Sequence, residues 1–190
     1  MRSTAVPLLA LATLLAAGCD DDGTSSRRLT SGEVAGVYRV CVLRFVPTNS
    51  VLPPANLLGR VVDATPPAGK PEPTLTLSPS SNAYQLIYTS ESDAFTEELR
   101  GSVAYGEDAV FPRFYSDDDS RGDIATDLLL PARSTLSFQT GPKRLSTSGG
   151  DLPHLVSRRA YATAANISES GLSSSIEGRM EISLREGSCS

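Results

Sequence analysis

The feature that most constrains the fold is an alternation of apolar and polar residues with a period of two, which is clearest near the end of the chain. The apolar face of the segment 176–185 consists of Ile176, Gly178, Met180, Ile182 and Leu184. Charged or polar residues occupy the other positions. Successive side chains of a strand point to opposite faces of a sheet, so this period is typical of a strand with one buried and one solvated side.

Shorter runs of the same kind recur along the chain and predict further strands at 37–46, 74–78, 84–90, 97–105, 109–115, 124–130, 134–140 and 155–163. Segments rich in glycine, proline, serine, asparagine and aspartate lie between them and favour turns. The fold class we expect is all-β, an antiparallel barrel of eight or nine strands, with a β-sandwich as the alternative. Residues 154–168 contain several alanines and form a short helix in a second interpretation.

One segment interrupts this rhythm, because residues 47–73 hold seven prolines, beginning with Pro47 and ending with Pro73. Proline at this density disrupts both sheet ladders and helices. The sequence therefore predicts a long loop with one short strand at 57–62. A loop of this length in a compact domain is usually a lid, a binding loop or a disordered insert.

The first 18 residues have the form of a cleaved export signal. Arg2 precedes an apolar run of about 13 residues that ends at Ala17, whereas a membrane-spanning helix needs roughly 20. We therefore treat residues 1–18 as a targeting segment that is not part of the fold.

The segment Leu15-Ala16-Ala17-Gly18-Cys19 follows this run, and here the chain resembles bacterial lipoproteins, whose signal peptide ends in small residues directly before a cysteine. The family usually has leucine where this chain has Ala16. The resemblance implies a diacylglyceryl thioether on Cys19 and a further acyl chain on its amine, which together give stable membrane anchoring. The alternative is an ordinary secretory signal that is cut nearby and leaves Cys19 as a spare thiol or a disulfide partner.

The resemblance also implies a location in the cell envelope, lipid-anchored to a bacterial membrane and facing the periplasm or the exterior. Asp20 resembles a signal that retains lipoproteins in the inner membrane of some bacteria. That rule differs between lineages, so inner and outer membrane both stay open.

The mature chain is predicted to consist of a flexible tether at 19–33 and a single β domain at 34–190. Removal of residues 1–18 takes Arg2 from the 17 basic residues, which leaves 16 against 22 acidic residues and a net charge of −6. The tether is acidic and small near its start, which is typical of disordered linkers. Affinity for nucleic acid depends on clustered Lys and Arg, so we expect no nucleic-acid partner.

Cys41 and Cys189 form an even pair once Cys19 is set aside. In an exported chain a disulfide between them is plausible, and it closes a loop that the chain-entropy model credits with about 5 kcal/mol. The alternative is one buried thiol and one exposed thiol near the C-terminus. If the sheet closes into a barrel, its first and last strands become neighbours, which brings the two cysteines toward each other.

At Gly36-Val37-Tyr38 the chain resembles the lipocalin-like domains of bacterial lipoproteins, in which a glycine and an aromatic residue open the barrel. The family's usual aromatic is tryptophan, which this chain lacks. The resemblance implies a lipocalin-like barrel in which an arginine of the last strand packs over the aromatic ring. Arg179 and Arg185 are the two candidates for that arginine.

No arrangement of residues indicates catalysis, so we expect no enzyme activity and no cofactor. His154 is the only histidine, and we interpret it as a surface residue on a strand edge rather than a general base. The acidic loop 117–123 departs from known calcium-loop patterns and is interpreted as a solvated turn, so no metal site is expected.

Two functions follow from these observations. The first is a non-enzymatic lipocalin-like module that binds a small apolar ligand in the barrel mouth, covered by the loop 47–73. The second is a structural or protein-interaction lipoprotein with a solid β core. The ten aromatic residues of the expected strands line a cavity in the first case and fill the core in the second, and filling is the usual outcome in small barrels.

Overall fold

The computed structural model describes residues 27–92, 94–106, 111–117, 130, 134–147 and 152–189. In chain order its elements are α1 (Ser31–Val34), β1 (Gly36–Pro47), β2 (Ala55–Asn56), β3 (Thr74–Leu77), β4 (Ala83–Thr89), β5 (Thr96–Tyr105), β6 (Pro112–Ser116), β7 (Ser137–Thr140), β8 (Lys143–Ser146), β9 (Leu152–Ser157), α2 (Arg158–Ala165) and β10 (Ser175–Glu186). The all-β class predicted from the sequence is confirmed.

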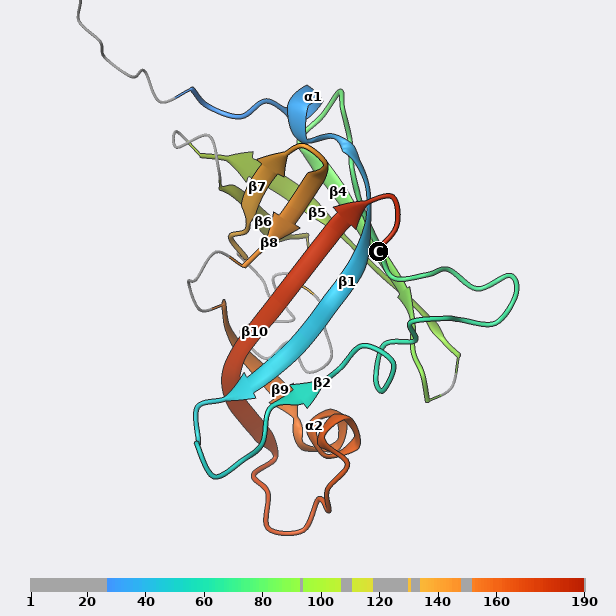
Figure 1. The fold of residues 1–190 in the computed structure, drawn as a ribbon, viewed down its shortest axis with the longest axis vertical. Helices are drawn as coiled ribbons and strands as arrows, with labels where there is room; N and C mark the ends of the chain where they lie inside the picture. The colour runs from blue at the N-terminus through green and yellow to red at the C-terminus, as the bar shows by residue number, and fades with distance from the viewer. Residues whose placement is uncertain are drawn as a thin grey trace, which may run out of the picture.

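The strands follow one another around a single antiparallel sheet in the order β6-β5-β4-β3-β1-β10-β8-β7, and the first and last long strands, β1 and β10, lie side by side (Figure 1). Two short strands lie off this path, because β2 pairs with β1 and β9 pairs with β10. Each main strand is bonded to its neighbour in sequence, which is an up-and-down order. One continuous sheet favours the predicted barrel over two packed sheets.

The two edges of the sheet meet through the residues that lead into β7. Arg113 of β6 forms an antiparallel bridge with Thr135. The Phe114 N–H donates to the Ser134 carbonyl at 2.8 Å, and the Leu136 N–H donates to the Pro112 carbonyl at 3.2 Å. These contacts join β6 to the residues that lead into β7, and the sheet curves into a half-barrel.

A β-bulge at Cys41 divides β1 into two halves, and the buried residues have even numbers before it and odd numbers after it. Val40 pairs with Leu184 while Val42 pairs with Ser183, so Cys41 is the extra residue. Tyr38 and Val40 are buried before the bulge, and Leu43 and Phe45 after it. One extra residue shifts the alternation by one position, which explains why the inward face of β1 changes from even to odd numbers.

The predicted alternation of the last strand is confirmed. The even-numbered residues of β10 from Ile176 to Leu184 are buried, and the odd-numbered Arg179 lies outside. Gly178 belongs to the buried face because a Cβ there would come within 2.5 Å of the Phe45 ring. Gly101 on β5 similarly lies under the Tyr84 ring, 2.6 Å from its would-be Cβ. The two glycines leave room for an aromatic ring of a neighbouring strand to lie against their backbone.

The N-terminal segment covers one end of the barrel. Leu29 and Val34 are buried there, and the Tyr38 hydroxyl donates a hydrogen bond to the Val34 carbonyl. Leu29 is the first buried residue of the described chain, and it lies within the segment expected to be a tether.

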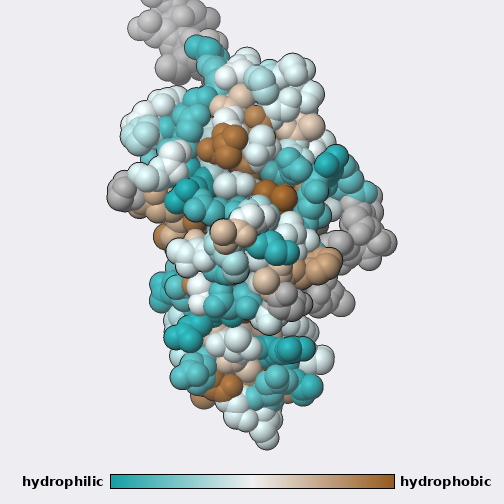
Figure 2. All heavy atoms as spheres, turned by 90° about the vertical axis from the view of Figure 1, so that its right-hand side faces the viewer, coloured by the Kyte–Doolittle hydropathy of each residue, from teal (hydrophilic) through white to brown (hydrophobic). Residues whose placement is uncertain are grey.

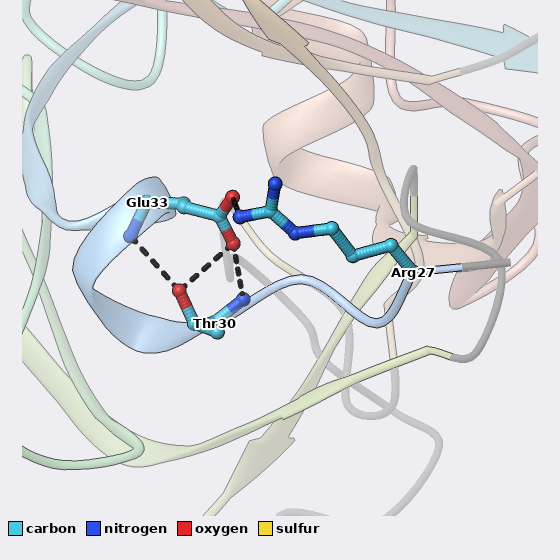
Figure 3. A network of polar contacts seen from close by, with 3 residues as sticks. All are labelled: Arg27, Thr30 and Glu33. Carbon is cyan, nitrogen blue, oxygen red and sulfur yellow. Dashed lines mark hydrogen bonds and ion pairs between the residues drawn. The ribbon is translucent and has the colours of Figure 1, made fainter. Parts of the chain in front are cut away.

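A capping box fixes the single turn of α1 at this end (Figure 3). Glu33 accepts hydrogen bonds from the Thr30 N–H at 2.9 Å and from the Thr30 hydroxyl at 2.8 Å, and it also pairs with Arg27. The hydrogen bond from the Thr30 backbone, followed by smaller contributions that include the Arg27 charge, holds the pKa of Glu33 below its usual value.

Helix α2 covers the other end, at the bottom of Figure 1. Ser157 caps it by accepting a hydrogen bond from the Ala160 N–H at 3.2 Å, and Asn166 ends it in the left-handed conformation. The Tyr161 ring is fully buried, meets Phe45 edge to face at 6.0 Å between ring centroids, and donates its hydroxyl to the Pro53 carbonyl at 2.7 Å.

The proline-rich segment 47–73 is better packed than the sequence predicts. Its short strand lies at β2 rather than at 57–62, where Leu58 and Val62 form only an isolated bridge. Leu57 and Val62 are buried in the core, and the Thr89 hydroxyl binds the Pro71 carbonyl at 2.8 Å. The prolines limit the ladders, but the apolar residues between them still pack against the barrel.

Candidate functional site

Many large side chains of the described residues are buried in the core of the barrel. Tyr38, Phe45, Phe114, Tyr161 and Met180 are among the side chains with less than 2% of their surface exposed. Burial raises the pKa of Tyr84 to about 12, with a smaller contribution from the Asp117 carboxylate. These aromatic residues belong to the buried core, and α1 and α2 lie at the two ends of the barrel.

An open groove lies between α2 and the turn that joins β4 to β5, and the buried residues Tyr88 and Ala160 form its floor. Its volume is about 300 Å³, which is at the lower end of the range for small-molecule sites. Tyr88 and Ala160 contribute its apolar surface. The charged residues on its walls are Arg60, Arg159 and Glu97.

A second hollow of about 580 Å³ continues this groove along α2 toward Ile167 and Glu169. Arg60 and Thr163 line both hollows. Together we call them the α2 groove. Asn166 also lines the second hollow, where its left-handed conformation at the end of α2 places it on the groove wall.

Backbone hydrogen bonds hold one wall of the α2 groove in place. The Asp63 N–H donates to the Thr89 carbonyl at 2.8 Å, and the Glu91 N–H donates to the Val61 carbonyl at 2.9 Å. Arg60 and Arg159 are exposed, and neither has an acidic partner among the residues that the structure describes. The groove therefore presents two arginines and several hydroxyl groups on a fixed frame, which suits carboxylate or amide groups of a partner.

Exposed apolar side chains also gather at this end of the barrel. Phe95 in the β4–β5 turn is 62% exposed, Ile167 beyond α2 is 38% exposed, and Val51 in the segment after β1 is 85% exposed. On the face shown in Figure 2, the apolar spots are separated by hydrophilic surface. The end that carries the groove thus combines polar and apolar anchors, as protein interfaces do.

His154 is not the surface residue that we expected. It lies on β9 as predicted, opposite Gly178, but only 5% of its surface is exposed. Because Gly178 has no side chain, the Phe45 ring has space to lie against it. The single histidine therefore belongs to the packed wall of the barrel and not to an open site.

The disulfide expected as one of two alternatives is present. Cys41 and Cys189 are bonded with their Cα atoms 5.3 Å apart. Gly187, with a positive φ of 85°, turns the chain after β10, so that the C-terminal tail crosses β1 and Cys189 reaches the bulge. The disulfide fastens this tail to the outer face of β1.

Other residues singled out by the sequence lie outside the described part of the chain. These include Cys19, the signal segment 1–18 and, apart from Asp117, the acidic loop 117–123. The predicted strand at 124–130 is described only at Leu130, which is buried.

The arginine contact implied by the lipocalin resemblance is not formed. Arg179 and Arg185 both occupy odd positions of β10, on the outer face, whereas Tyr38 points into the barrel. Neither arginine can pack over the inner ring from that face. Burial beneath α1 and the hydrogen bond to Val34 hold the Tyr38 side chain instead.

Within the described ranges, His, Cys, Asp and Glu side chains form no group of three that would hold a metal ion. No helix in that part of the chain has the length and apolar character needed to span a bilayer. Comparison with known proteins gives no relative, since no family model, no curated protein and no solved structure matches the chain.

Proposed function

We propose that the mature chain is an envelope protein anchored to a bacterial membrane through lipidated Cys19, and that its solid barrel presents the α2 groove to another envelope protein. The observation that carries this proposal is the set of large side chains buried in the barrel between α1 and α2, which favours the surface over the interior as the place for binding. The groove and the exposed Phe95 and Ile167 lie together at the α2 end.

The position of the N-terminus supports the same orientation. The described chain begins at Arg27, next to α1, and α2 lies at the opposite end of the barrel (Figure 1). A tether that leaves near α1 directs the α2 groove away from the membrane. The α2 groove then faces away from the membrane, into the compartment where a partner protein can reach it.

Carriage of a small apolar ligand inside the barrel is the competing proposal, and it follows from the lipocalin resemblance. The side chains that fill the interior count against it, since a ligand needs them to move aside. The polar walls of the α2 groove also suit an apolar molecule poorly.

Site-directed photo-crosslinking in the native envelope tests the interaction. A photoreactive residue in place of Thr163, which is exposed and lines both hollows, is expected to give one discrete protein adduct. Phe95→Ser in the same chain is expected to weaken that adduct. The matched control is a photoreactive residue at Ser102, exposed on β5, which is expected to give none.

Absence of an adduct at Thr163, or an equal yield at Ser102, contradicts the proposed interaction. The anchor is tested separately with Cys19→Ser. This variant is expected to lose the mass of the acyl chains and to leave the membrane fraction, whereas an unchanged mass and distribution contradicts lipidation.

A further inference from the structure

Three arginines stand in register across three adjacent strands. Arg39 of β1 pairs with Arg185 of β10, and Arg185 pairs with Arg144 of β8. Paired residues of neighbouring strands point to the same face, and the flanking Leu184 and Leu145 are buried. The three arginines therefore form a row on the outer face of the barrel, which we call the arginine row.

Like charges placed directly opposite each other on a sheet repel and cost stability. The chain does little to offset this repulsion locally. Arg39 pairs with Glu72, but Arg185 and Arg144 have no acidic partner among the described residues. The row is also positive on a protein whose formal charge is −5. An arrangement that folding alone disfavours suggests an external anion.

The surroundings of the arginine row suit an oxyanion. The Arg144 Nε donates to the Ser183 hydroxyl at 3.2 Å, and a row of serines formed by Ser137, Ser146 and Ser183 runs beside it. Arginine binds phosphate through two parallel N–H donors, which gives both strength and geometry.

The nearest acidic group on β10 is directed elsewhere. Glu186 follows Arg185 and therefore points to the opposite side of the strand, where its carboxylate lies 2.8 Å from the position of a Cβ on Gly36. The Glu186 carboxylate therefore does not neutralise the positive charge of the arginine row.

The arginine row lies on the half of the barrel nearer to α1. Arg39 is close to the start of β1, Arg185 is close to the end of β10, and Lys143, next to Arg144, donates to the Ala35 carbonyl at 2.5 Å. Nine residues lie between Cys19 and buried Leu29, and the ten extended steps from one to the other span at most about 35 Å. An anchor at Cys19 therefore keeps this half of the barrel near the lipid headgroups.

From this placement we infer that the arginine row docks the anchored barrel on the phosphate groups of anionic lipids. The inference rests on the lipid anchor of the proposed function and adds a second membrane contact. One lipid anchor leaves the barrel free to rotate about its tether. A basic patch formed by Arg144 and Arg185, beside the Glu72-paired Arg39, restricts that rotation and fixes which face meets the membrane.

Vesicle binding of the unlipidated mature chain, carrying Cys19→Ser, tests the inference without relying on the anchor. The wild-type barrel is expected to bind vesicles that contain phosphatidylglycerol, to ignore pure phosphatidylcholine, and to lose binding as salt is raised. Arg144→Gln with Arg185→Gln is expected to weaken binding about 30-fold. The matched control removes two arginines elsewhere, with Arg60→Gln and Arg100→Gln, and is expected to keep most of the affinity.

Stability separates this role from a structural one. Because the double substitution in the row removes a repulsion, its Tm is expected to stay unchanged or to rise. Equal vesicle binding by wild type and the row variant overturns the inference. Full competition by millimolar inorganic phosphate overturns it as well, because the row is then a site for a free anion. Both results leave the photo-crosslinking test at Thr163 untouched.

Discussion

At the scale of single residues, glycine and aromatic side chains are matched across strands. A Cβ on Gly101 would lie 1.9 Å from the Tyr115 carbonyl oxygen and 2.6 Å from the Tyr84 ring. Gly101→Ala is therefore expected to lower the free energy of unfolding by roughly 1–3 kcal/mol, because backbone has to shift. Urea denaturation followed by circular dichroism measures the change.

Gly32→Ala is the control for this substitution, since nothing lies within 4 Å of the added Cβ and the residue is helical. It is expected to leave stability unchanged or slightly raised. If Gly101→Ala matches the control, the close approach of the Tyr84 ring to β5 is incorrect.

The buried tyrosines make stability sensitive to alkali. Burial raises the pKa of Tyr84 from 10 to about 12, so the folded state keeps its proton where the unfolded chain has lost it. The contribution of Tyr84 to the free energy of unfolding is therefore fully present below pH 10 and is lost between pH 10 and about 12. Denaturation curves recorded across this range measure the fall.

Tyr84→Phe is expected to make the alkaline fall shallower without removing it. Burial also raises the pKa of Tyr38, whose hydroxyl is bonded to the Val34 carbonyl. A stability that stays level from pH 10 to 12 in the wild type contradicts the buried, protonated state of both side chains.

At the scale of elements, α2 closes one end of the barrel like a plug, because its Tyr161 side chain is buried against Phe45. Tyr161→Phe removes one hydrogen bond to Pro53 and is expected to cost about 1 kcal/mol, whereas Tyr161→Ala empties a buried site and is expected to cost roughly 3–5 kcal/mol. Thr163→Ala, on the exposed side of α2, serves as the control and is expected to be nearly neutral. Similar losses for all three variants contradict the plug.

The disulfide fastens the C-terminal tail across β1. Cys41→Ala with Cys189→Ala is expected to lower the free energy of unfolding by about 2–5 kcal/mol, because the bond joins residues 148 positions apart and restricts the unfolded chain. Denaturation with and without a reductant makes the same comparison on the wild type. A reduced protein as stable as the oxidised one contradicts this role of the disulfide.

Elements with strong period-two alternation were predictable from the sequence, and β10 is the clearest example. Elements with weaker alternation were not predictable in this way. β8 was missed because Lys143 to Ser146 offer only one buried apolar residue, Leu145, next to a predicted turn. The segment 155–163 was predicted as a strand, with a short helix over 154–168 as the alternative, but the chain changes from strand to helix at Ser157, where the side chain serves as an N-cap.

The candidate site was less predictable than the fold, because it depends on packing between distant segments. Arg60, Glu97 and Arg159 come from three parts of the chain and carry no shared motif. The arginine row was equally hidden, since register decides which of the outward residues stand side by side. The β-bulge at Cys41, which resets that register within β1, leaves only a change of parity in the sequence.

At the scale of the whole molecule, the two ends of the barrel differ in what they present. The α1 end carries the chain entry and the arginine row, and the α2 end carries the groove and the exposed Phe95. An anchored protein with this polarity has one side for the membrane and the other for a partner. The central claim is that the barrel between them is solid and carries nothing inside.

Native mass spectrometry of the protein purified from its own envelope, before and after denaturation, tests that claim most directly. A solid barrel predicts a mass equal to that of the mature chain with its acyl chains in both spectra. An apolar small molecule that accompanies the folded protein and is released on denaturation would contradict the claim, and would establish the barrel interior as a ligand site.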